Sequence, residues 1–218
     1  MFSLRVTMPI DATPQATAMF GLASGLLTCV GFIPYVRAIV TGRARPCRTS
    51  WLIWSILGVI AIASLRQEGA GPSLIFAGAQ VGGTILVFLL AIGHGRGATF
   101  ARRDIGVLIA AAAGLGLWAV TSQAGWALAV TIAIGLLGGI GTMAKAYRAP
   151  NSEPMLPWAA FLASAGLGVA SVDGADPILL SYPLYLLALY SGIVGALIAG
   201  RRAHGRRWTE AQTRPTYS

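Results

Sequence analysis

Polar side chains that interrupt long apolar stretches are the residues of this sequence best placed to do chemistry. Gln80 and Thr84 stand four positions apart in "AQVGGTILVF", so they share one face of a helix, and Trp54 follows Trp51 at a spacing that also shares a face. A polar group surrounded by hydrocarbon needs a hydrogen-bonding partner, so we expect these side chains to point into a bundle of helices. There they either bind a small molecule or only hydrogen-bond to neighbouring helices, and the residue types leave both interpretations open.

Carboxyl groups are a second source of chemistry. Glu68, Asp173 and Asp176 lie in short polar joints between apolar stretches, where they could act as general acids in a membrane-embedded, terpene cyclase-like enzyme acting on a prenylated or lipid substrate. The ordinary alternative is that they are solvated carboxylates at the ends of loops. None of the seven acidic residues lies in the middle of an apolar stretch, which favours facilitated movement of a solute over proton-driven pumping.

Motifs for metal or cofactor chemistry are absent from the sequence. It contains no C-x-x-C pair, no H-E-x-x-H and no P-loop, so metal, nucleotide and hydrolase chemistry have no sequence support, and we expect no metal and no cofactor. The two cysteines, Cys29 and Cys47, do not make a disulfide framework and are expected to be free thiols.

Composition places these residues in a membrane. Of 218 residues, 56% are hydrophobic and 11% are charged, whereas a soluble domain carries about 25% charged residues. In lipid only helices and closed barrels satisfy the backbone, so we expect an all-α integral membrane protein with seven transmembrane helices. The expected spans cover residues 15–40, 50–66, 73–93, 104–122, 125–145, 157–172 and 177–199.

The basic residues predict the orientation. With an N-terminal tail over 1–14 outside and a basic tail over 200–218 in the cytoplasm, fourteen of the sixteen lysines and arginines fall on the cytoplasmic side. This distribution explains the net charge of +9 without nucleic acid, and it predicts a multi-pass protein of the cytoplasmic (inner) membrane. Trp51, Trp126 and Trp158 stand at span ends and are expected to anchor there in the interfacial aromatic belt.

One phrase of the sequence occurs twice. "GFIPYVRAIVTGRARPCRTSW" and "GIGTMAKAYRAPNSEPMLPW" each pass from a helix through a basic residue and a proline to a tryptophan that opens the next span. Two three-helix repeats over 15–93 and 125–199, joined by a linker helix over 104–122, account for this recurrence. Because the linker crosses once, both repeats start on the same side and are parallel.

These motifs resemble the PQ-loop superfamily, which includes the SWEET and SemiSWEET sugar transporters. The likeness rests on the three-one-three plan, on "RPCRTSWLIW" and "KAYRAPNSEP", and on "YPLY" in the last span. It implies facilitated transport of a small polar solute through a central cavity between the repeats. A non-transporting membrane receptor of the same fold is a further alternative.

The resemblance also implies roles for particular residues. The family's Pro-Gln dipeptide corresponds to Pro34-Tyr35 in the first repeat but to Thr142-Met143 in the second, so Pro34 is the candidate hinge, with Pro183 the corresponding candidate in the last span. The alternative is a static kink that neighbouring helices absorb. The family's central cavity is lined by aromatic and polar side chains. The corresponding substrate-binding residues here are Trp54, Gln80, Thr84, Ser164, Tyr185 and Ser191.

The charged joints on the cytoplasmic side are the last candidate site. They are expected to gate the inner mouth through ion pairs, to contact a lipid headgroup or a substrate phosphate, or only to fix the topology. Their members are Arg45, Arg48, Lys145, Arg148 and Glu153. The expected partners are the lipid bilayer and a small-molecule substrate, and a homo-oligomer is left open.

Overall fold

The described part of the chain is built of helices. The computed structural model describes residues 13–94 except 45 and 47, seven positions between 105 and 120, and residues 124–213 except 175. In this part there is no strand, which confirms the all-helical prediction. The elements are α1 (Pro14–Val40), α2 (Arg48–Gln67), α3 (Ser73–His94), α5 (Ala124–Arg148), the short 3-10 turn η1 (Pro150–Ser152), α6 (Met155–Ala170) and α7 (Pro177–Thr213).

Four of these helices, α1, α3, α5 and α7, are long and apolar enough to cross a membrane, and α2 and α6 are shorter apolar helices. The chain is therefore compatible with a membrane protein, as its composition predicts. The expected linker helix over 104–122 and the expected tail over 1–14 lie largely outside the described residues.

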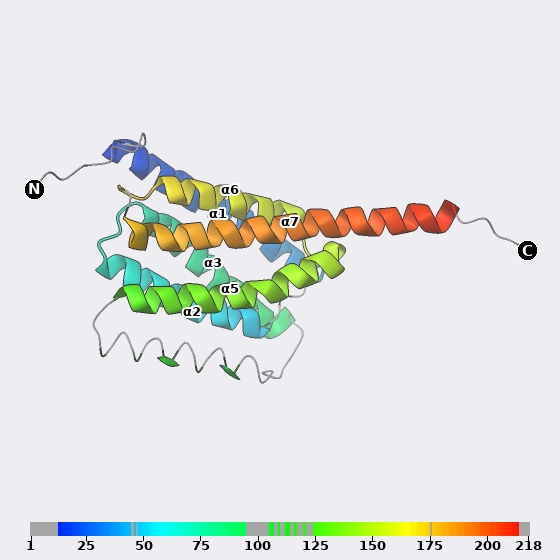
Figure 1. Cartoon of the computed structure of the whole chain (residues 1–218), viewed down its shortest axis with the longest axis horizontal. Coiled ribbons are helices and arrows are strands. Elements are labelled where there is room, and N and C mark those ends of the chain that lie inside the picture. The colour runs from blue at the N-terminus through cyan, green and yellow to red at the C-terminus, as the bar shows by residue number, and fades with distance from the viewer. Residues whose placement is uncertain are drawn as a thin grey trace, which may run out of the picture.

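Helix α7 is longer than the predicted span, which ends at residue 199. It continues to Thr213 and projects beyond the rest of the bundle (Figure 1). Residues 200–213 contain alanine, arginine, glutamate and glutamine, which favour helix, and no proline, so nothing in this stretch stops the helix. Residues 200–213 of the tail are thus a helical extension of the last span.

The ends of α1 are fixed by local hydrogen bonds. Pro14 occupies the first turn, where its missing N–H costs nothing, and the Ala16 N–H donates to the Thr13 hydroxyl at 3.4 Å. At the other end the Thr41 hydroxyl donates to the Arg37 carbonyl at 2.7 Å, and Gly42 adopts a φ of 71° that reverses the chain.

The six main helices pack in a ring. Helix α3 lies between α1 and α2, and α7 lies between α5 and α6; the ring closes through contacts of α1 with α6 and of α2 with α5. The first three helices and the last three therefore pack in the same order. Figure 1 shows these helices side by side.

Contacts between helix ends fix their directions. At one end of the bundle, the Arg48 guanidinium donates to the Ala91 carbonyl at 2.7 Å, which joins the start of α2 to the end of α3. At the other end, Gly21 of α1 packs against Pro72, just before α3.

The second three helices follow the same pattern: Gly135 and Gly139 of α5 approach Tyr185 and Leu189 of α7 in the same order, whereas Gly31 of α1 approaches the start of α6 and Ser24 approaches Ser164 further along it. Helices α1, α3, α5 and α7 thus run one way, while α2 and α6 run the opposite way.

Charge is divided between the two ends of the bundle. The end that holds the C-terminus of α1 carries most of the described cations, and we call it the basic end; its members are Arg37, Arg43, Arg48, Lys145, Arg148, Arg201 and Arg202. The opposite end carries Glu68, Asp173 and Asp176 together with Arg66. The division follows from the sequence, because each basic joint connects helix ends that meet at the same end of the ring.

Candidate functional site

A cavity lies in the middle of the ring, between α2, α3, α5, α6 and α7. Its walls are mainly aromatic, and the rings contact one another: Trp51 packs edge-on against Trp54 with centroids 5.4 Å apart, and Phe161 lies 5.7 Å from Tyr190. Edge-to-face and tilted aromatic pairs of this kind hold large side chains in defined positions. The aromatic lining residues are Trp51, Trp54, Trp158, Phe161, Tyr182, Tyr185 and Tyr190.

Besides the aromatic residues, three described polar side chains line this cavity: Gln80 and Thr84 of α3, and Thr131 of α5. The Thr84 hydroxyl donates to the Val81 carbonyl of its own helix at 2.8 Å. Gln80 is different, because its side chain is buried and its amide oxygen Oε1 has no hydrogen-bond partner among the described residues. A buried polar atom without a partner is rare in proteins and calls for an explanation.

The cavity is small in this conformation. Its volume is about 40 Å³, measured as the space open to the centres of water molecules, which is enough for about three waters. Binding sites for small molecules usually occupy about 300–1,000 Å³. A solute of ordinary size would therefore fit only if the surrounding helices separated.

The predicted binding residues divide into two groups. Trp54, Gln80, Thr84 and Tyr185 line the cavity together, although they come from three different helices. Ser164 and Ser191 are not among its lining residues. Thr131, Tyr182 and Tyr190 also line the cavity but are not among the predicted binding residues. For Tyr182 a sequence signal exists, because it stands three positions before Tyr185 in "SYPLY" and so shares a helix face with it.

Ser164 instead joins α6 to α1. Its hydroxyl hydrogen-bonds to the hydroxyl of Thr28, and the Ser24 carbonyl oxygen lies 3.1 Å from Ser164 Oγ and 2.9 Å from Thr28 Oγ1. The carbonyl accepts a hydrogen bond from whichever of the two hydroxyls does not donate to the other. This buried polar contact satisfies Ser164 fully within the protein. Ser191 is exposed on the outer face of α7.

Two of the three predicted interfacial anchors were assigned wrongly. Trp51 and Trp158 are only 5% and 3% exposed, and both pack against Tyr35 of α1, with ring centroids 5.4 and 6.3 Å away. Trp51 and Trp158, which correspond in the two recurring sequence phrases, thus both contact Tyr35 inside the bundle. Trp126 alone is exposed, at 54%, as an interfacial anchor would be.

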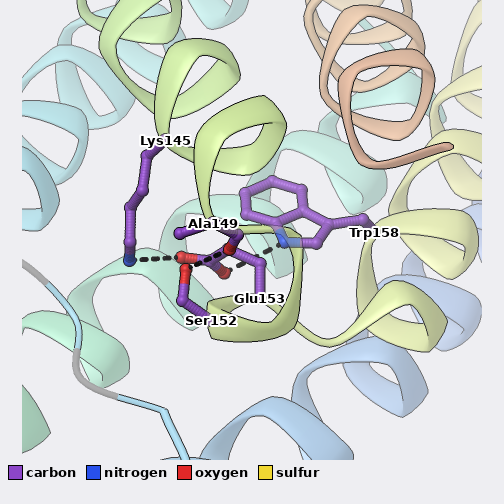
Figure 2. Close-up of polar contacts among 5 residues, drawn as sticks. All are labelled: Lys145, Ala149, Ser152, Glu153 and Trp158. Atoms are coloured by element: carbon purple, nitrogen blue, oxygen red, sulfur yellow. Dashed lines mark hydrogen bonds and ion pairs between the residues drawn. The ribbon is translucent and has the colours of Figure 1, made fainter. Parts of the chain in front are cut away.

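A polar contact closes the basic end of the bundle next to Trp158. Figure 2 shows Glu153 between the end of α5 and the start of α6. One oxygen of its carboxylate forms an ion pair with Lys145 Nζ at 2.8 Å, and the other accepts a hydrogen bond from Trp158 Nε1 at 3.2 Å. The turn η1 brings the carboxylate inward, and there the Ser152 hydroxyl donates to the Ala149 carbonyl at 2.7 Å. Glu153 is buried, although sequence alone places it in a loop.

The other expected gate residues lie apart from this contact. Arg48 is half-buried and bonds to the end of α3, while Arg148 is exposed. Arg45 lies outside the described residues.

The expected hinge prolines are both inside helices. Pro34 interrupts α1 close to Tyr35, and Pro183 interrupts α7 and is fully buried. Each removes one backbone hydrogen bond from its helix, which makes these positions easier to bend than the rest.

The carboxylates expected of an enzyme are remote from the cavity. Glu68, Asp173 and Asp176 are exposed at the end opposite the basic one. Asp176 has a structural role, since its Oδ1 accepts hydrogen bonds from the N–H groups of Ile178 and Leu179 at 2.8 and 3.1 Å and so caps α7. Among the described residues no cluster of histidine, cysteine, aspartate and glutamate could hold a metal ion.

Comparison with known proteins gives no relative: no protein-family model, no curated protein and no solved structure matches this chain.

Proposed function

We propose that this protein is a PQ-loop- or SWEET-like transporter that moves a small, uncharged polar solute across the cytoplasmic membrane. The observation that carries the proposal is the amide of Gln80, which lines the central cavity and whose acceptor oxygen has no hydrogen-bond partner among the described residues. A polar side chain at this depth costs stability unless it meets a partner, and a bound solute is such a partner.

The helix arrangement supports this class of protein. The orders α1–α3–α2 and α5–α7–α6 correspond element by element, and the helices that correspond run in the same direction. This is the arrangement expected of two parallel repeats over 15–93 and 125–199, with the cavity at their interface. The linker helix over 104–122 completes the proposed seven-helix plan, and the positive-inside rule places the basic end in the cytoplasm.

The lining of the cavity indicates the class of solute. No charged side chain is among the described residues that line it, so these residues offer a charged solute no counter-ion. Aromatic walls offer flat apolar surfaces, while Gln80, Thr84 and Thr131 offer hydrogen bonds. A small neutral solute with several hydroxyl groups and an apolar face, such as a sugar or a polyol, satisfies both parts of the wall.

The closed cavity suggests how access would alternate. The Lys145–Glu153–Trp158 contact and the aromatic stack on Tyr35 seal the basic end in this state. Bending of α1 at Pro34 would move Tyr35 away from Trp158 and open that end. The second recurring phrase has no proline at the position of Pro34, so we propose that the first repeat bends more.

Binding is tested by tryptophan fluorescence in detergent against a panel of neutral sugars and polyols. Because Trp51, Trp54 and Trp158 line the cavity, a bound solute is expected to change the emission in a saturable way, and Trp54→Phe is expected to reduce this change. Trp126→Phe is the matched control, since Trp126 is exposed on the surface and its loss should leave the change intact. If no solute in the panel changed the tryptophan emission, the result would count against the proposal.

A further inference from the structure

A groove runs along the outer face of the bundle between α1 and α3, away from the central cavity. It has a volume of about 680 Å³, within the size range of small-molecule sites. Its floor is formed by small residues of α3, namely Ala79, Gly82 and Gly83, and its α1 wall includes the exposed side chains of Ile33 and Val40. The groove exists because these small residues leave α3 recessed behind its neighbour, and a Cβ built on Gly82 meets no atom within 4 Å.

The length of the groove matches half a bilayer. Its α1 wall extends from Cys29 to Thr41, which at 1.5 Å per residue is about 18 Å. One leaflet of the hydrocarbon core is about 15 Å thick. The groove therefore reaches from the membrane surface at the basic end to about the middle of the membrane, which is the depth of one acyl chain.

The mouth of the groove is cationic. Arg37 lines it directly, and the Arg43 guanidinium reaches the same place, where its Nε donates to the Thr41 hydroxyl at 3.0 Å. Both arginines are exposed, and among the described residues no carboxylate pairs with either of them. Two arginines beside each other at the membrane surface suit a phosphate group, which accepts several charge-assisted hydrogen bonds.

We infer that this groove binds one anionic phospholipid, with an acyl chain along Ala79 and Gly82 and the phosphate between Arg37 and Arg43. The bound lipid belongs to the cytoplasmic leaflet if the basic end faces the cytoplasm, and this orientation rests on the proposed function. The lipid site itself does not require that the protein transports a solute. A second copy of the chain is a poorer occupant. A two-fold axis along the membrane normal would place the same cationic mouths against each other and make them repel.

Native mass spectrometry of the purified protein with an equimolar mixture of phosphatidylglycerol and phosphatidylethanolamine tests the inference. Wild type is expected to retain phosphatidylglycerol in preference to phosphatidylethanolamine. Arg37→Ala and Arg43→Ala should each lower that preference about fivefold. Gly82→Leu fills the floor of the groove and should lower retention of phosphatidylglycerol at least about fivefold.

Gly195→Leu is the matched control, because Gly195 is exposed on α7 and a Cβ there also meets no atom within 4 Å. It should leave retention of phosphatidylglycerol unchanged. Equal retention of the two lipids by wild type, or retention by Gly82→Leu equal to that of wild type, would overturn the inference. The arginine variants keep the test decisive if Gly82→Leu does not fold.

Cys29 provides an independent measurement, because it is exposed and lines the groove. In a Cys47→Ser background, membranes treated with an oxidant are expected to give monomer only. The inference would be contradicted if the oxidant gave a dimer joined through Cys29 and the protein retained no phosphatidylglycerol. The groove would then be assigned to a second copy of the chain.

Discussion

Replacing Gln80 with leucine is expected to lower solute transport about tenfold or more while the protein stays at least as stable as wild type. The tenfold loss is the free-energy equivalent of one buried hydrogen bond to the solute. Stability should not fall, because Oε1 of Gln80 has no partner among the described residues and leucine removes the cost of burying it. The measurements are solute uptake into liposomes and the thermal midpoint in detergent.

A matched control exists for this substitution. The Ser64 hydroxyl is the other buried oxygen without a hydrogen-bond partner in the described part of the chain, and Ser64 does not line the cavity. Ser64→Ala should therefore leave uptake unchanged. Equal loss of uptake in both variants, or normal uptake by Gln80→Leu, would show that the amide does not meet the solute.

Adding a single methyl group at Gly83 is expected to destabilise the bundle by about 2 kcal/mol or more. A Cβ at this position would overlap the ring of Phe32, so α1 and α3 would have to separate. The same ring packs on Phe161 with centroids 4.6 Å apart, so displacing it also disturbs the contact of α1 with α6. The thermal midpoint of Gly83→Ala in detergent measures the effect.

The neighbouring glycine provides the comparison. A Cβ on Gly82 meets nothing within 4 Å, so Gly82→Ala should have the thermal midpoint of wild type or a slightly higher one. Equal midpoints for the two alanine variants would mean that α1 and α3 do not approach each other at Gly83 as described.

Most of the described helices could be predicted closely from the sequence because their boundaries are set by composition; the far end of α7 is the exception. The span expected over 73–93 is the helix Ser73–His94, and the span expected over 15–40 is Pro14–Val40. Apolar stretches of membrane length, bounded by charged or glycine-rich joints, leave little choice of where a helix ends.

The direction in which each side chain points could be predicted only in part. Gln80 and Thr84 share a face, as their spacing requires, and that face is turned to the cavity. Ser191 is exposed while its neighbour Tyr190 takes the inward position. A serine hydroxyl can be satisfied by a carbonyl of its own helix, as Ser55 is by Trp51, so a serine inside a span need not face inward.

Tertiary contacts decided the remaining assignments. A tryptophan at the end of a span can face lipid or protein, and Trp158 faces inward because Tyr35, Phe161 and Tyr190 surround it. Glu153 is buried because Lys145 and the indole of Trp158 both reach its carboxylate. Neither arrangement follows from spacing within one segment, since each depends on how separate helices meet.

The central claim is that a neutral polar solute crosses the membrane through the cavity around Gln80. Uptake of labelled sugars and polyols into liposomes that contain only this purified protein tests the claim most directly. We expect saturable uptake of at least one such solute, above that of empty liposomes and independent of a proton gradient, because no acidic side chain is among the described residues that line the cavity. Saturable binding of a solute without any uptake would contradict the claim and would assign the protein to non-transporting receptors.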